Sequence, residues 1–114
     1  MIENIIDKEF LSINFYKFTV DLVFSENTTL SIFNQFVVYD NNLKIILVWN
    51  FNNGIENANK LLLNNLINTN VLKIEFIPNK YIKIFFKSNY IQIFINSLNG
   101  ESLNLKIDND WVVY

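Results

Sequence analysis

Apolar residues recur at every second position over most of the chain, which is the period of a β-strand with one buried face. The pattern is clearest over residues 71–95, where three alternating runs are separated by Pro78-Asn79 and Ser88-Asn89. Proline fixes φ and asparagine accepts a left-handed backbone, so both pairs predict tight turns. We therefore expect residues 71–95 to form a three-stranded antiparallel meander that provides one wall of the core.

The same alternation predicts further strands before and after this meander. They are expected at residues 11–15, 18–24, 28–33, irregularly over 35–39, and at 43–51, 103–107 and 111–114. Asn99-Gly100 is expected to form the corner of a hairpin, because both residues accept positive φ. Residues 2–10 fit either a short helix or an irregular arm.

One segment, residues 55–67, departs from the two-residue period and predicts a helix. Its apolar residues form a stripe that consists of Ala58, Leu62 and Leu66 and is broadened by Leu61, Leu63 and Ile67. Asn68 or Asn70 can take the left-handed conformation that ends a helix. We therefore predict an α+β fold, a mainly antiparallel sheet of about seven or eight strands with one main helix packed on it. At 114 residues the chain is expected to form a single domain over 1–114.

The two halves of the chain resemble each other. Residues 11–15 correspond to 72–76, residues 21–27 to 83–89, and residues 30–33 to 91–94, with one-residue slips in the connecting turns. Any two alternating meanders also align to some extent by chance in so biased a composition. If the repeat is real, the sheet is built from two similar meanders linked by the helix.

Composition excludes several classes of function. The chain has no cysteine and no histidine, so it lacks a thiol nucleophile, a disulfide and the usual general base. All nine of its basic residues are lysine and the net charge is −2, so the composition argues against nucleic acid as a partner. The N-terminus lacks the features of a signal peptide, and the longest uninterrupted apolar run, residues 45–49, is far shorter than the ~20 residues that span a bilayer. We expect a cytoplasmic protein that does not contact a membrane.

Carboxylates offer the one candidate for site chemistry. Asp108 and Asp110, with Glu101 nearby, could hold Ca²⁺ or Mg²⁺. No dense set of further oxygen ligands surrounds them, so a solvated turn is the simpler interpretation. The sequence also has no glycine-rich phosphate loop and no nucleophile elbow. We therefore predict no catalytic residues, no metal and no cofactor.

A second face of the meander combines aromatic rings with lysines. Tyr81, Lys83, Phe85 and Lys87 share it, and Tyr90, Gln92 and Phe94 lie alongside if the next strand pairs in register. The simplest interpretation is that the predicted helix covers this face, so that Tyr81, Phe85 and Phe94 are core residues. A protein-binding surface and a platform that stacks unpaired bases are the alternatives. The exposure of the face that bears Lys83 and Lys87 distinguishes a core face from an exposed binding face.

Four short patterns carry a family resemblance. They are V-x-L-x-F-x-x-x-x-x-L-x-I at residues 20–32, L-x-x-x-L-I-N-x-x-V at 62–71, I-x-I-x-F at 82–86, and Glu101-Ser102. From residue 11 onward the chain thus resembles a family of small bacterial proteins of unassigned activity, many encoded beside polymorphic or contact-dependent toxins, whose members are taken to be immunity proteins. It departs from the family pattern at Asn68 and Asn89, where we expect glycine. The resemblance implies a protein that neutralises a cognate toxin by binding to it, without catalysis.

If the toxin is a basic nuclease, carboxylates of this chain could mimic phosphate and speed association, while a buried aromatic residue holds the complex. Partner-binding residues are therefore expected in two groups, Glu101, Asp108, Asp110 and Trp111 near the end of the chain, and Tyr81, Lys83 and Tyr90 on the central strands. A solvated surface also explains most such acidic runs. The alternative function is a single-stranded nucleic-acid-binding module that uses the aromatic face. Weakly charged edge strands leave both a monomer and a homodimer open.

Overall fold

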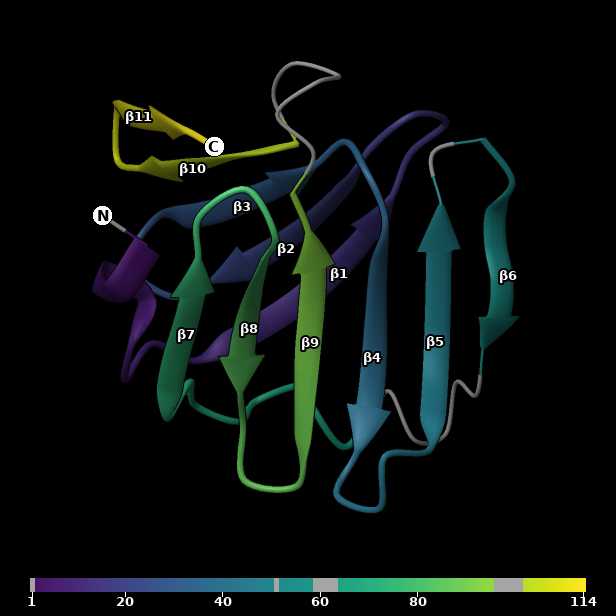
Figure 1. Cartoon of the computed structure of the whole chain (residues 1–114). Helices are drawn as coiled ribbons and strands as arrows, with labels where there is room; N and C mark the ends of the chain where they lie inside the picture. Colours follow the sequence, from purple (N-terminus) through teal and green to yellow (C-terminus); the bar gives the residue numbers. More distant parts are fainter. Residues whose placement is uncertain (1, 51, 59–63, 96–101) are drawn as a thin grey trace.

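The computed structural model of the chain describes residues 2–50, 52–58, 64–95 and 102–114. Two antiparallel sheets pack face to face, with the strand orders β1-β2-β3-β10-β11 and β6-β5-β4-β9-β8-β7. Figure 1 shows the six-stranded sheet in front, with the strands of the five-stranded sheet crossing obliquely behind it. The predicted α+β class is wrong, because the described residues form β-strands and one short 3-10 helix.

The strand bounds follow the order of the chain within each sheet. The five-stranded sheet consists of Phe10–Phe15 (β1), Val20–Phe24 (β2), Thr28–Ile32 (β3), Leu103–Ile107 (β10) and Asp110–Val113 (β11). The six-stranded sheet consists of Phe36–Asp40 (β4), Ile45–Asn50 (β5), Gly54–Ala58 (β6), Lys73–Ile77 (β7), Tyr81–Phe85 (β8) and Asn89–Phe94 (β9). The 3-10 helix, Ile2–Ile5 (η1), precedes β1. The described residues thus contain more strands than the seven or eight predicted.

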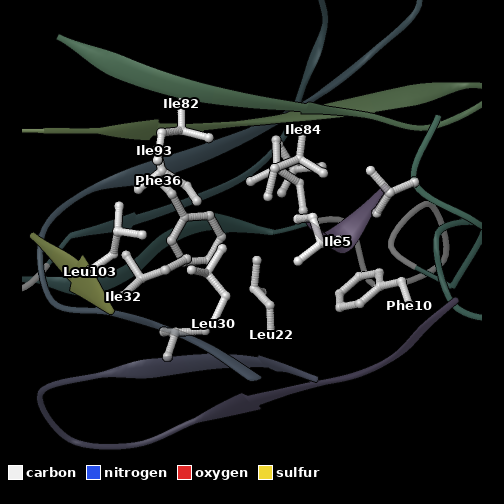
Figure 2. Close-up of a cluster of buried hydrophobic side chains, with 14 of the residues drawn as sticks. Ile5, Phe10, Leu22, Leu30, Ile32, Phe36, Ile82, Ile84, Ile93 and Leu103 are labelled. Atoms are coloured by element: carbon white, nitrogen blue, oxygen red, sulfur yellow. The ribbon is translucent and has the colours of Figure 1, made fainter. Parts of the chain in front are cut away.

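The predicted meander over residues 71–95 is confirmed as β7, β8 and β9, which pair antiparallel in chain order. Its inward residues, such as Ile84, lie in one apolar cluster with residues of the other sheet, such as Leu22. Figure 2 shows this cluster, in which side chains of both sheets meet between the layers. Each fully buried side chain of this size contributes about 1.5–3 kcal/mol through removal of apolar surface from water. The core therefore lies between the sheets, and each sheet keeps one outer face.

The predicted main helix over residues 55–67 is absent from the described part of that segment. Gly54–Ala58 instead forms β6, which pairs with β5 through partners such as Val48 and Asn57, and residues 64–68 form turns. Residues 59–63 lie outside the described part. Asparagine is a poor helix-interior residue, and residues 54–58 satisfy the backbone groups along the edge of β5, so pairing overrides the apolar stripe. Leu66, which the stripe placed on a helix, is fully buried in a turn.

The left-handed conformation predicted for Asn68 is present, with φ 68°, but it closes a turn and not a helix. The Asn68 N–H donates to the Phe10 carbonyl at 2.7 Å, and the Phe10 N–H donates to the Thr69 carbonyl at 2.8 Å. After this turn, residues 69–71 therefore run alongside the start of β1.

The two meanders of the predicted repeat are both present, but they lie in different sheets. One is β1-β2-β3 and the other is β7-β8-β9. The chain between them adds β4, β5 and β6 to the six-stranded sheet, and β6 lies where the linking helix was predicted to begin. The two units therefore face each other across the core and do not extend a common sheet.

The turn from β4 to β5 is shaped by Asp40. One carboxylate oxygen of Asp40 accepts the N–H groups of Asn42 at 2.8 Å and Lys44 at 2.9 Å. The Leu43 N–H donates to the Asp40 carbonyl at 3.1 Å, and Leu43 takes φ 62°. The strand predicted over residues 43–51 therefore begins later than expected, at Ile45, because residues 41–44 form the turn.

Candidate binding surfaces

The outer face of the six-stranded sheet carries the aromatic rings and lysines singled out in the sequence. Strand register places five of its residues in one row of cross-strand neighbours, namely Ile45, Tyr39, Tyr90, Phe85 and Lys73. Lys83 and Tyr81 follow on the same face of β8. We call Tyr39, Lys73, Tyr81, Lys83, Phe85 and Tyr90 the aromatic-lysine face.

The interpretation of this face as core is wrong. Tyr81, Phe85 and Phe94 are partly exposed, whereas the alternate residues Ile82 and Ile84 are fully buried between the sheets. Figure 1 shows no described segment in front of the six-stranded sheet on this side. The face therefore belongs to the surface of the described molecule.

Neighbouring side chains hold the rings of this face in place. Tyr39 and Tyr90 stack with ring centroids 4.9 Å apart and an interplanar angle of 21°, and Phe85 lies 5.5 Å from Tyr90. The Lys83 ammonium lies 5.0 Å from the Tyr81 ring and 5.5 Å from the Tyr90 ring. The Lys73 ammonium lies 5.3 Å from the Phe85 ring. Ring and cation contacts of this kind fix side-chain orientation and occupy ring faces.

The phenols of Tyr81 and Tyr90 keep their protons at neutral pH. The Tyr81 hydroxyl donates to Glu75 Oε1 at 2.9 Å, and this hydrogen bond, followed by burial and the carboxylate charge, raises the Tyr81 pKa. Partial burial, followed by the nearby Tyr39 phenol, raises the pKa of Tyr90. The face therefore combines neutral hydroxyl donors with ammonium groups.

Charge is distributed unevenly between the two sheets. The six-stranded sheet and its turns carry most of the described lysines, Lys44, Lys73, Lys80, Lys83 and Lys87. The five-stranded sheet, its turns and the segment before it carry most of the described carboxylates, Glu3, Asp7, Glu9, Asp21, Glu26, Asp108 and Asp110. On the six-stranded sheet, the carboxylates of Asp40 and Glu75 already accept hydrogen bonds. The two sides of the molecule thus differ in sign.

The second predicted group lies on the β10-β11 hairpin of the five-stranded sheet. Asp108, with φ 55°, and Asn109 form its turn, and Asp110 begins β11. Trp111 is 57% exposed and lies opposite Lys106, whose ammonium is 5.2 Å from the indole ring. Glu101 lies outside the described residues.

The predicted partner-binding residues therefore do not form one site. Tyr81, Lys83 and Tyr90 lie together on the outer face of the six-stranded sheet. Asp108, Asp110 and Trp111 lie on an edge hairpin of the other sheet. The two groups define two separate surfaces of opposite charge.

Two concave regions accompany these surfaces. A polar groove of about 370 Å³ lies between the turns of the five-stranded sheet and is lined by Asn27, Thr29, Lys106, Asp108 and Asn109. A mainly apolar cavity of about 200 Å³ opens between the sheets and is lined by Phe10, Ile13, Phe15, Val38, Asn64, Leu66, Ile67 and Ile91. Among the described residues, no group of three or more acidic side chains lies close enough to hold a metal ion.

Sequence reasoning missed several residues on the aromatic-lysine face and next to it. Tyr39 and Ile45 join the row only because β4 pairs with both β5 and β9, a long-range pairing that alternation does not specify. Leu43, 70% exposed at the turn between β4 and β5, had one signal, an apolar residue inside an Asp- and Asn-rich turn. Lys73 needed the register of β7 on β8.

No family model, curated protein or solved structure matches the chain. The resemblance to immunity-type proteins therefore stays a prediction. None of the helical residues that the structure describes belongs to a helix long and apolar enough to cross a membrane.

Proposed function

We propose that the chain is a cytoplasmic immunity-type protein that neutralises a cognate protein toxin by binding to it, without catalysis. The observation that supports this best is the aromatic-lysine face, an ordered set of rings and ammonium groups on the open side of a sheet. The aromatic and charged side chains supply contact area and orientation, and the sheet supplies a rigid base.

Tyrosine is enriched among the residues that dominate protein interfaces, because it combines a large apolar ring with a hydroxyl donor. The stacked Tyr39-Tyr90 pair and the lysines over Tyr81 and Phe85 hold these side chains before any partner arrives. Less rotamer entropy is then lost on association. Binding at such a surface neutralises a toxin by covering its active site or its substrate surface.

The test uses the chain and the purified C-terminal domain of the protein encoded by the adjoining reading frame. Titration calorimetry measures binding, and growth of cells that express the toxin domain, with and without the chain, measures neutralisation. We expect a stable complex and restored growth. Restored growth without any complex contradicts neutralisation by direct binding, and failure of both contradicts the proposal. Light scattering on the same samples gives the oligomeric state.

A single-stranded nucleic-acid-binding module is the second candidate, because the same rings and lysines lie on an outer face. Stacking on unpaired bases needs free ring faces. Here Tyr39 and Tyr90 stack on each other, and ammonium groups lie over Tyr81 and Phe85. The lack of arginine weakens this candidate further. Fluorescence anisotropy with a thymidine oligonucleotide tests this candidate. Salt-sensitive binding of the oligonucleotide would favour nucleic-acid binding over toxin binding as the function.

A further inference from the structure

Leu43 combines two features that neither folding nor solubility explains. Its φ of 62° is a left-handed conformation that disfavours residues with a Cβ atom, and its side chain is 70% exposed. At the other positive-φ positions among the described residues the chain carries aspartate, glutamate, asparagine or glycine. Leu43 is thus the one apolar residue in this set, and burial does not compensate its backbone strain.

The turn holds Leu43 in this conformation firmly. Asp40 accepts hydrogen bonds from the backbone of Asn42, Leu43 and Lys44, so the left-handed angle is imposed by three contacts on one residue. Strain that the surroundings impose on an exposed residue is typical of binding sites. The turn therefore presents a leucine side chain to solvent in a fixed position.

Leu43 lies in the turn next to the end of the aromatic row. Ile45, two residues on, is 42% exposed and is the cross-strand neighbour of Tyr39, which stacks on Tyr90. Figure 1 shows the turns after β4 and β8 at the same end of the six-stranded sheet. The exposed apolar residues Leu43 and Ile45 thus adjoin the rings along the chain and across the strands, and we call this set the apolar strip.

Exposed lysines surround this strip. Lys44 adjoins Leu43, Lys73 ends the row, and Lys87 lies in the turn after β8. None of the three forms an ion pair with a carboxylate among the described residues, where Lys8 and Glu26 form the recorded pair. The surface that complements this strip is therefore apolar at its centre and acidic at its border.

A folded protein fits these features better than a nucleic acid. The aliphatic side chains of Leu43 and Ile45 fill an apolar recess but offer no ring for stacking a base. The rings beside them already contact each other and the lysines. Phosphates would complement the lysines but leave the aliphatic end of the strip in water.

We propose that Leu43 anchors the partner, and that the partner presents an apolar recess bordered by carboxylates which receives Leu43 and Ile45 and faces Lys44, Lys73 and Lys87. This inference rests on the proposed function and names the surface and the kind of partner surface through which the toxin is bound. It assigns no contact to the β10-β11 hairpin.

The test measures the affinity of the same toxin domain for single variants. Leu43→Ala keeps the left-handed backbone and removes most of the side chain, and Leu43→Gly also removes the strain. We expect both to weaken binding by about tenfold or more, as loss of an interface anchor does. Lys73→Glu should weaken binding and reduce its dependence on salt. Trp111→Ser, which removes another exposed apolar side chain from the other sheet, is the control and should leave affinity unchanged.

The outcomes separate the inference from the proposed function. Wild-type binding with unchanged affinity for the Leu43 and Lys73 variants, and a loss for Trp111→Ser or Asp108→Lys, overturns the inference and leaves the proposed function intact. Absence of wild-type binding overturns both. A thymidine oligonucleotide that binds the wild type but not Lys73→Glu, in place of the toxin domain, assigns the face to nucleic acid. Thermal unfolding of each variant shows whether a loss of binding comes from a loss of folding.

Discussion

Replacing Leu43 with glycine should make the protein more stable, by about 0.5–1 kcal/mol in the free energy of unfolding. A left-handed conformation costs a residue with a Cβ atom about 1–2 kcal/mol. Glycine avoids that cost but gains freedom in the unfolded chain, which takes back about 0.5–1 kcal/mol. With 70% of its surface exposed, the leucine side chain contributes little burial to the folded state. The gain corresponds to a rise of about 2–6 °C in the midpoint of thermal unfolding for a chain of 114 residues.

Urea unfolding followed by tryptophan fluorescence measures this change. Trp49 is 2% exposed and stacks on Phe36 with ring centroids 5.9 Å apart, so its emission reports exposure of the core. Equal denaturant slopes for wild type and variant are needed, because the free energies compare only for similar unfolding transitions. Leu43→Asn, which tolerates the left-handed region, should also stabilise the fold.

Leu43→Ala is the control that isolates the backbone angle. It removes the exposed side chain but keeps a Cβ atom in the left-handed conformation, so stability should stay near the wild-type value. A lower stability for Leu43→Gly contradicts the assignment of strain. An equal gain for glycine and alanine means that the exposed side chain, and not the backbone angle, causes the destabilisation.

Three further predictions concern the core, the turn and the aromatic-lysine face. Phe36→Ala should destabilise the fold by about 3–5 kcal/mol and shift Trp49 emission to longer wavelength, and urea unfolding followed by fluorescence measures both effects. A loss of less than about 1 kcal/mol contradicts a tightly packed core. Asp40→Ala should cost about 1–2 kcal/mol in the same assay, whereas Asp40→Asn, which keeps an acceptor oxygen, should cost less. Glu75→Gln should lower the pKa of Tyr81 in a phenolate absorbance titration, because the carboxylate raises it. The stability from this pair is present below the ordinary tyrosine pKa of 10.0 and is lost as pH rises through the raised pKa of the folded state; an unchanged titration refutes the contact.

Alternation predicted the strands well, because it reports which side chains a strand buries. Val20, Leu22 and Phe24 are buried at every second position, as the pattern requires. The same pattern does not say which strands pair. Residues 28–32 pair with residues 103–107, which lie far away in the sequence. Alternation could not predict this long-range pairing, nor that the two meanders lie in separate sheets.

The helix prediction was wrong because an apolar stripe also fits a chain that buries single residues from turns. Leu66 and Val71 are both buried in the core, one in a turn and one in extended chain beside η1 and β1. Asparagine at positions 64, 65 and 68 favours turns over a helix interior. Without the helix, the face bearing Tyr81 and Lys83 became a surface, and its interpretation changed with it.

The candidate site was harder to predict than the fold, because it depends on register. Tyr81, Lys83 and Tyr90 were singled out from one meander, where neighbouring strands follow each other in sequence. Tyr39 and Ile45 required knowledge that β4 inserts beside β9. The conformation of Leu43 depends on hydrogen bonds to Asp40 that the sequence shows only as a turn.

A two-sheet sandwich has two outer faces, and in this chain they differ in charge and in the type of side chain that they expose. On the five-stranded sheet the outward residues of neighbouring strands include Asp21 and Ser31, joined by a hydrogen bond of 2.7 Å. On the six-stranded sheet the corresponding positions carry rings and lysines whose ammonium groups lie over those rings. Carboxylates on one side and lysines on the other give the molecule an electric dipole. Such a dipole would turn the cationic side toward an acidic partner during approach. In the proposed complex, the rings and Leu43 contribute to affinity only once that side is in contact with the partner, so orientation and binding depend on the same face.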